Sequence, residues 1–144
     1  MVTMLVRGAT PSRAVVAGQG LRQVLGFGGG TASLLRRVFG GSETFEPGSP
    51  EERTARWFRS SGVDPVAVLH VLDSLPGTPE EDLGRIRVPT LVAMGSEDER
   101  ADSAEQLVAA LPHGTLATVP ADHSTAVAAP EFVTAVLDLL AGGR

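Results

Sequence analysis

Two short apolar segments in the second half of the chain limit the folds that it can adopt. They are residues 88–94 (V-P-T-L-V-A-M), closed by Gly95, and residues 115–119 (T-L-A-T-V), closed by Pro120. Both are apolar nearly throughout, which is typical of strands covered on both faces in a parallel sheet. A helical segment lies between them, and another follows at residues 130–141. The order strand, helix, strand, helix predicts an α/β fold.

A third strand is expected near the start of the chain, at residues 13–17 (R-A-V-V-A). About sixty residues separate it from the next strand, too many for a simple connection. Residues 26–86 are first rich in glycine and then helical in pattern. We therefore expect a single domain, residues 1–144, with about three parallel strands, at 13–17, 88–94 and 115–119, flanking helices and a cap-like helical insertion at 26–86.

Capping signals place the helices of this scheme. Ser49-Pro50 with Glu52 predicts a helix from 49 to about 60, ended by Gly62. Three further capping signals each start with a polar residue. Asp64-Pro65 predicts a helix at about 65–75, Thr78-Pro79 with Glu81 one at about 79–86, and Asp102 with Glu105 one at about 103–111.

Composition excludes several classes of function. The chain carries 12 basic and 17 acidic residues, a net charge of -5 and no cysteine. A mildly acidic chain without a basic run is a poor partner for nucleic acid, and thiolate metal sites and disulfides are excluded. No histidine spacing matches a metal motif, no phosphate loop is complete, and no apolar run approaches the ~20 residues of a membrane span. We expect no cofactor, no metal and no membrane partner, and, without a leader-like start, a cytoplasmic location.

Polar turns follow both of the later strands. One reads Gly95-Ser96-Glu97-Asp98-Glu99 and the other Pro120-Ala121-Asp122-His123-Ser124. The carboxyl ends of parallel strands meet at the same edge of a sheet, and neighbouring strands lie ~5 Å apart. An acid from the first turn and His123 from the second can therefore form a carboxylate–imidazole pair. In such a pair the carboxylate fixes the tautomer, and the histidine can act as a general base.

These segments resemble the C-terminal half of an α/β-hydrolase. The resemblance is carried by I-R-V-P-T-L-V-A-M-G-S-E-D (86–98), L-V-A-A-L-P (107–112), V-P-A-D-H (119–123) and the final amphipathic helix. It implies that Asp98 is the catalytic acid and His123 the catalytic base, in the family's order Ser, Asp, His. The implied activity is hydrolysis of an ester, lactone, amide or similar bond in a small-molecule substrate through an acyl-enzyme.

The resemblance also implies that the nucleophile lies outside this chain. Residues 5–20 look like the segment just after the nucleophile helix, which leaves out the first five strands and the oxyanion loop. No G-x-S-x-G is present. Ser42, in Gly40-Gly41-Ser42, follows a helix-like segment, whereas a nucleophile elbow joins a strand to a helix. Gly18-Gln19-Gly20 could be an elbow that has lost its serine, although no suitable helix follows it.

The other polar and aromatic candidates have structural explanations. The G-x-x-D spacing favours Asp98 over Glu97 and Glu99, and Asp122 is expected to be a solvated loop charge. The remaining candidates are residues that we expect to be exposed or packed: His113 in a solvent-exposed turn, His70 packed in mid-helix, and Trp57 and Phe58 packing their helix onto the body.

Two functions remain open, so it is uncertain whether the chain is itself an enzyme. The first is a hydrolase whose nucleophile comes from a separate chain or from a longer start of the same gene. The second is a catalytically inactive truncated remnant or an interaction module. In that case the apolar edge strand at 13–17 would pair with another chain, and we expect a homo-oligomer.

Overall fold

The computed structural model of this chain describes four stretches, residues 1–26, 30–40, 44–74 and 76–142. Two compact units are present, and each is described by itself. The first, here called the sheet unit, is Met1–Phe27 with Gly77–Arg144. The second, the helical unit, is Gly28–Pro76, which lies within the insertion expected at 26–86. The role of this insertion as a cap stays a prediction.

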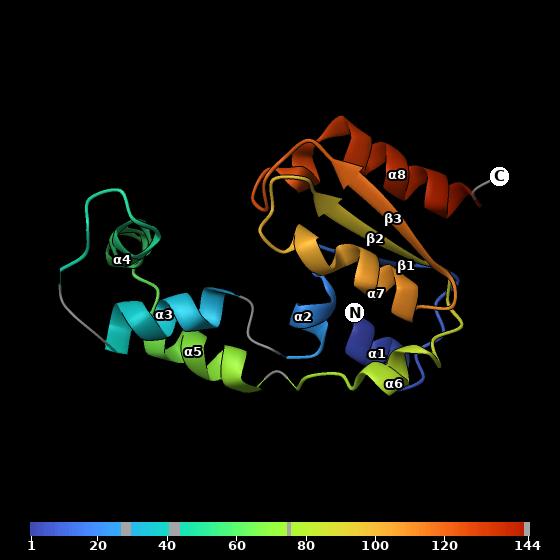
Figure 1. The fold of residues 1–144 in the computed structure, drawn as a ribbon, viewed down its shortest axis with the longest axis horizontal. Coiled ribbons are helices and arrows are strands. Elements are labelled where there is room, and N and C mark those ends of the chain that lie inside the picture. The colour runs from blue at the N-terminus through green and yellow to red at the C-terminus, as the bar shows by residue number, and fades with distance from the viewer. Residues whose placement is uncertain (27–29, 41–43, 75, 143–144) are drawn as a thin grey trace. The chain divides into compact units, whose positions relative to one another are not determined.

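The sheet unit contains three parallel strands in the order β1-β2-β3 (Figure 1), as the sequence predicts. Their bounds differ slightly from those expected: β1 is Ala14–Ala17, β2 is Thr90–Gly95 and β3 is Gly114–Val119. Two register pairs fix where the strands end relative to one another, Ala17 with Ala93 and Gly95 with Val119. The carboxyl ends of β2 and β3 are therefore level.

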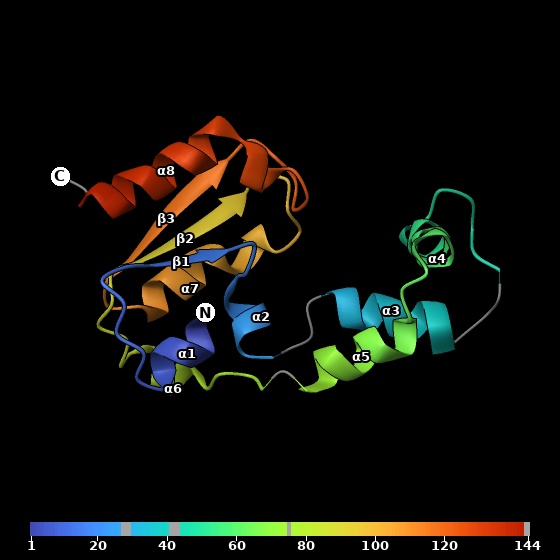
Figure 2. The same ribbon diagram turned by 180° about the vertical axis from the view of Figure 1, so that it is seen from behind.

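Helices cover both faces of this sheet. Helix α8 (Pro130–Ala141) lies on one face and α7 (Ala104–Ala110) on the other, as the two opposite views show (Figures 1 and 2). The α7 side also carries three short helices, α1 (Val2–Val6), α2 (Leu21–Val24) and α6 (Glu80–Leu83). Two single 3₁₀ turns, Ala101–Ser103 and Ala126–Ala128, precede α7 and α8.

Strands β2 and β3 differ in burial although their compositions are alike. Every residue of β2 is buried, as expected for a strand covered on both faces. In β3 only Val119 is buried, and Leu116 is 37% exposed, so the same expectation is wrong for β3. The reason is position: within the described residues β3 pairs with β2 alone, at the edge of the sheet, and the helices cover it incompletely.

The helical unit consists of α3 (Gly30–Gly40), α4 (Pro50–Ser61) and α5 (Pro65–Ser74). The predicted start of α4 is confirmed, because Ser49 Oγ accepts a hydrogen bond of 3.1 Å from the backbone N–H of Glu52. Gly62 ends this helix in the left-handed conformation, with φ +69°.

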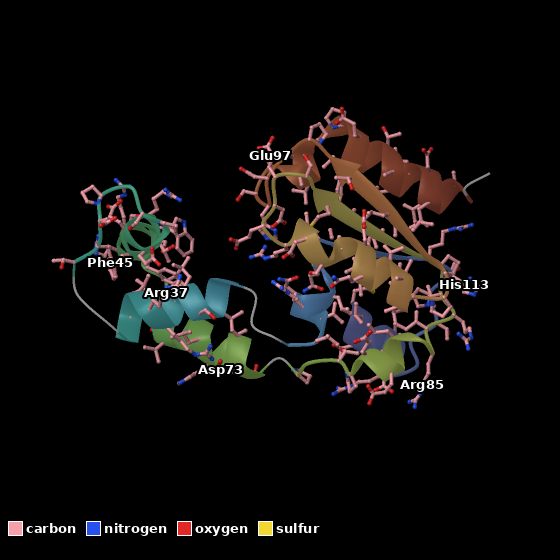
Figure 3. All side chains as sticks on the ribbon, in the orientation of Figure 1. Arg37, Phe45, Asp73, Arg85, Glu97 and His113 are labelled. Atoms are coloured by element: carbon pink, nitrogen blue, oxygen red, sulfur yellow. The ribbon has the colours of Figure 1, made fainter. Side chains whose placement is uncertain are left out.

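Aromatic packing and exposed ion pairs join the helices of this unit. Phe58 of α4 is buried and makes an edge-to-face contact with Phe39 of α3, at 5.1 Å between ring centres. Arg37 pairs with Glu51, and Arg36 pairs with Asp73 (Figure 3 labels Arg37 and Asp73). These exposed pairs add little stability individually.

The side chains of Trp57 and His70 are less buried than expected. Trp57 is 55% exposed and contacts Phe58 edge-to-face, so Trp57 is not packed as expected, whereas Phe58 is buried within its own unit. That these side chains pack their helix onto the body stays a prediction. His70 is exposed on α5, and α5 has no buried residue. The expectation that His70 is packed in mid-helix is therefore wrong.

Two of the predicted side-chain caps do not form. Thr78 is buried, its backbone N–H donates to the carbonyl of Val24, and α6 starts later, without a side-chain cap. Asp102 lies in the 3₁₀ turn before α7 and pairs with Arg22 at 3.3 Å. None of the helices in the described stretches is long and apolar enough to cross a membrane.

Candidate acid–base site

The turn after β2 fixes the carboxylate of Asp98. Its backbone N–H donates to the carbonyl of Gly95 at 3.2 Å, which closes the turn. Its Oδ1 accepts a hydrogen bond of 3.0 Å from the backbone N–H of Arg100. The side chain of Asp98 is only 1% exposed, so the sequence buries a carboxylate at the end of the central strand. A buried carboxylate needs hydrogen-bond partners, and Oδ2 of Asp98 can accept a bond from a second group.

The turn after β3 is ordered by Asp122. Its Oδ1 accepts hydrogen bonds from the backbone N–H groups of Ser124 and Thr125 and from the Thr125 hydroxyl, at 2.8 to 2.9 Å. The Thr125 hydroxyl, followed by the backbone N–H groups of Thr125 and Ser124, lowers the pKa of Asp122 below its ordinary value. Asp122 is exposed, as expected, but it also holds the loop that carries His123.

Backbone hydrogen bonds join the two turns. The N–H of Ser96 donates to the carbonyl of Val119 at 2.8 Å, and that of Glu97 donates to the carbonyl of Ala121 at 3.0 Å. Gly95 permits this approach, because a Cβ at its position would lie 2.2 Å from the carbonyl oxygen of Ala121. A glycine at the end of β2 is therefore a steric requirement for the site.

Asp98 and His123 meet where these turns join. His123 Nδ1 lies 2.7 Å from Asp98 Oδ2. A carboxylate can only accept, so Nδ1 carries the proton and Nε2 is the nitrogen with a free lone pair. The His123 side chain is 52% exposed. A buried carboxylate thus bonds an accessible imidazole at an open pocket of about 300 Å³, lined by residues 97–100 and 122–124.

The other sequence candidates do not join this pair. Glu97 lies at the same rim of the sheet, whereas His113 precedes β3 and lies at the opposite end, as Figure 3 shows. His70 belongs to the helical unit, and Ser42 lies outside the described residues. Within the ranges that the structure describes, no group of three or more His, Asp or Glu side chains could hold a metal ion.

One contact of the site was not anticipated from the sequence. The turn after β1 reaches the imidazole, because a Cβ on Gly18 would lie 2.7 Å from His123 Cε1. The G-x-G pattern of Gly18-Gln19-Gly20 was the signal that could have indicated this contact. From the sequence alone it was interpreted only as the end of a strand or as an elbow that has lost its serine.

Comparison with known proteins identifies the fold. No protein-family model and no curated protein matches this sequence. Solved structures do match: a suspected non-heme bromoperoxidase, BpoC, of Mycobacterium tuberculosis H37Rv (21% identity, TM-score 0.60) and the enol-lactonase of Burkholderia xenovorans LB400 (18%, 0.57). MGS-M2, an α/β hydrolase enzyme from a Medee basin deep-sea metagenome library, is similar at 19% identity and a TM-score of 0.55.

Coverage is unequal in these three comparisons. They cover 98%, 97% and 99% of this chain, but only 62%, 60% and 61% of the matched chains. The 144 residues therefore correspond to less than two thirds of such a structure. At these identities the likeness establishes the fold alone.

Proposed function

Because the chain has the fold of one part of an α/β hydrolase, we propose that it carries the general base and the orienting acid of such an enzyme. The reaction would be hydrolysis of an ester, lactone, amide or similar bond in a small molecule. The observation that carries this proposal is the 2.7 Å contact between His123 Nδ1 and the buried carboxylate of Asp98.

In the proposed reaction Nε2 of His123 removes the proton from a nucleophilic hydroxyl as that oxygen attacks the substrate carbonyl. Asp98 stabilises the imidazolium that forms and keeps Nδ1 protonated. Nε2 then gives its proton to the leaving group. In the second half-reaction Nε2 removes a proton from the water that attacks the acyl carbonyl, and it then returns that proton to the oxygen of the nucleophile as the acid product leaves.

The nucleophile in this proposal comes from polypeptide outside these 144 residues, in a longer form of the same chain or in a second chain. Two observations support this. The sequence contains no G-x-S-x-G, and the chain covers about three fifths of the matched structures. Triad members act as a unit, so the 144 residues alone are expected to retain at most a small residual rate.

The test compares p-nitrophenyl acetate hydrolysis by residues 1–144 with hydrolysis by the polypeptide expressed together with its upstream reading frame. We expect a rate near background for the first and turnover by the second. His123→Ala and Asp98→Asn should each lower kcat of the active form by about 10³-fold or more. His113→Ala, at the opposite rim, is the matched control and should not change kcat. A His123→Ala variant as active as His113→Ala would refute the proposal.

A second candidate is a non-catalytic interaction module that pairs through β1. In the described residues β1 is hydrogen-bonded on one side only, to β2. An open strand edge can pair with another copy of the chain. Sedimentation of residues 1–144 at tens of micromolar checks this. A concentration-dependent dimer is expected, and a strictly monomeric species would exclude this function.

A further inference from the structure

We propose that the turn Gly18-Gln19-Gly20 after β1 positions both members of the Asp98–His123 pair. This inference rests on the proposed function, and it concerns how the pair is held. The turn belongs to a third strand of the sheet, separate from the two strands whose turns carry Asp98 and His123. It supplies contact surface rather than a reacting group.

The imidazole of His123 lies against Gly18. A Cβ at its position would lie 2.7 Å from His123 Cε1, 3.1 Å from Nδ1 and 3.9 Å from Nε2. The Cε1–Nδ1 edge of the ring therefore rests against the Gly18 backbone, and Nδ1 is the nitrogen that bonds Asp98. Gly18 also has φ +64°, a conformation in which other residues are strained. Any larger residue must displace the ring or the turn.

Gly20 lies against the segment that follows Asp98. A Cβ on Gly20 would lie 2.7 Å from the carbonyl oxygen of Arg100 and 2.2 Å from Ser103 Oγ. The backbone N–H of Arg100 is the group that donates to Asp98 Oδ1. Gly20 therefore packs directly against the segment that orients the carboxylate.

The turn itself is anchored. The N–H of Gly18 donates to the carbonyl of Ala93 in β2 at 3.0 Å, and the N–H of Gly20 donates to Gln23 Oε1 in α2 at 3.0 Å. Both amides are therefore engaged and cannot serve as oxyanion donors. Their engagement fits a rigid support and does not fit a nucleophile elbow that has lost its serine.

The mechanistic consequence concerns ring orientation. An imidazole linked only to Asp98 can turn about its side-chain bonds and lose the 2.7 Å contact, whereas a ring edge held against fixed backbone cannot turn toward that backbone. Gly18 is thus a positioning residue: it keeps Nδ1 on Asp98 and leaves Nε2 to exchange a proton with the nucleophile.

The first test is Gly18→Ala, with Gly62→Ala as the matched control. Gly62 has φ +69° and nothing within 4 Å of its would-be Cβ, so both variants carry the same backbone strain and only one crowds His123. The readout is the ¹H and ¹⁵N spectrum of the imidazoles in residues 1–144, with His70→Gln and His113→Gln for assignment. We expect Gly18→Ala to shift or abolish the Nδ1–H resonance of His123, and Gly62→Ala to leave it unchanged. Unchanged His123 resonances in Gly18→Ala would overturn the proposal.

A double-variant cycle covers the case in which Gly18→Ala folds poorly. Gly18→Ala should lower the Tm by roughly 4 °C more than Gly8→Ala, which has positive φ and open space in the same unit. If the imidazole causes the excess, His123→Ala should remove it, and the double variant should regain the lost Tm or the lost fold. An excess that persists without the imidazole would contradict the proposal.

A kinetic readout applies to whichever form hydrolyses the ester. There Gly18→Ala should lower kcat by about 10²-fold with little change in KM, because a small misplacement of a reacting group strongly lowers the rate of the chemical step. An unchanged kcat would contradict the proposal. If no form hydrolyses the ester, the proposed function fails, while the spectra and the cycle still decide the role of Gly18.

Discussion

The sheet unit and the helical unit are stabilised by different kinds of interaction. The sheet unit has a contiguous buried cluster with side chains at 0–1% exposure, among them Leu83, Met94 and Leu107. Among the described side chains of the helical unit, the buried apolar ones are few: Leu35, Val38, Ala55 and Phe58. The other interactions of the helical unit include exposed ion pairs and the side-chain cap of α4.

This difference matters for the site. Asp98, His123 and Gly18 all belong to the sheet unit, at the ends of strands whose positions are set by burial and parallel pairing. The helical unit contributes none of them. Substitutions in the sheet core should therefore disturb the acid–base pair, whereas substitutions in the helical unit should leave it intact.

The largest effect is expected from Leu107→Ala. Leu107 has 0% exposure in the sheet core, and its truncation leaves a cavity worth about 3–4 kcal/mol in the free energy of unfolding. Urea unfolding followed by far-UV circular dichroism measures it. The matched control is Leu137→Ala on α8, where the side chain is 58% exposed and the change should stay below about 1 kcal/mol. Equal losses would contradict the assignment of the core.

Phe58→Ala tests the helical unit in the same way. It removes the edge-to-face contacts with Phe39 and Trp57, and we expect a loss of about 3 kcal/mol within this unit. Trp57 is the single tryptophan and the chain has no tyrosine, so intrinsic fluorescence reports on this unit directly. The His123 imidazole resonances should not move. Their displacement by Phe58→Ala would show that the two units are not separate with respect to the site.

Two serines give a smaller and sharper contrast. Ser49 caps α4, so Ser49→Ala should lower the free energy of unfolding by about 1 kcal/mol. Ser103 directly precedes α7 but makes no side-chain cap, and its buried Oγ has no hydrogen-bond partner within the described part of the chain. Ser103→Ala should therefore be neutral or slightly stabilising. A loss equal to that of Ser49→Ala would mean that the Ser103 hydroxyl has a partner.

The smallest effect is expected on acidification. The pKa of Asp122 is lowered, so its carboxylate stabilises the loop above its ordinary pKa of 3.8. That stabilisation is lost as the pH falls through the lowered value. The amide resonances of Ser124 and Thr125 should move between about pH 5 and about pH 2. Asp122→Asn, which cannot titrate, should abolish this movement, and its persistence would assign the effect to another group.

The strands could be predicted from local patterns, and the acid–base pair could be predicted from the parallel arrangement of those strands. An apolar run closed by glycine or proline predicts a strand, and parallel strands carry their following turns to one edge, which places Asp98 near His123. The incomplete burial of β3 could not be predicted, since it depends on the number of neighbours around the strand.

The missing caps and the Gly18 contact both involve residues that are distant in the sequence. Thr78 and Asp102 carry the usual local signal, but the Thr78 backbone N–H donates to the Val24 carbonyl and the Asp102 carboxylate pairs with Arg22. Gly18 meets His123 through an approach of segments more than one hundred residues apart, which no local pattern records.

Because the ends of β2 and β3 are level, the site depends on the number of residues in each of the two turns. Gly95 pairs with Val119, and from these positions Asp98 follows after three steps and His123 after four. One inserted or deleted residue in either turn would carry the carboxylate or the imidazole out of reach, while replacement of an exposed neighbour such as Glu97 would not. Related sequences should therefore vary at exposed positions such as Glu97, yet keep both spacings without gaps.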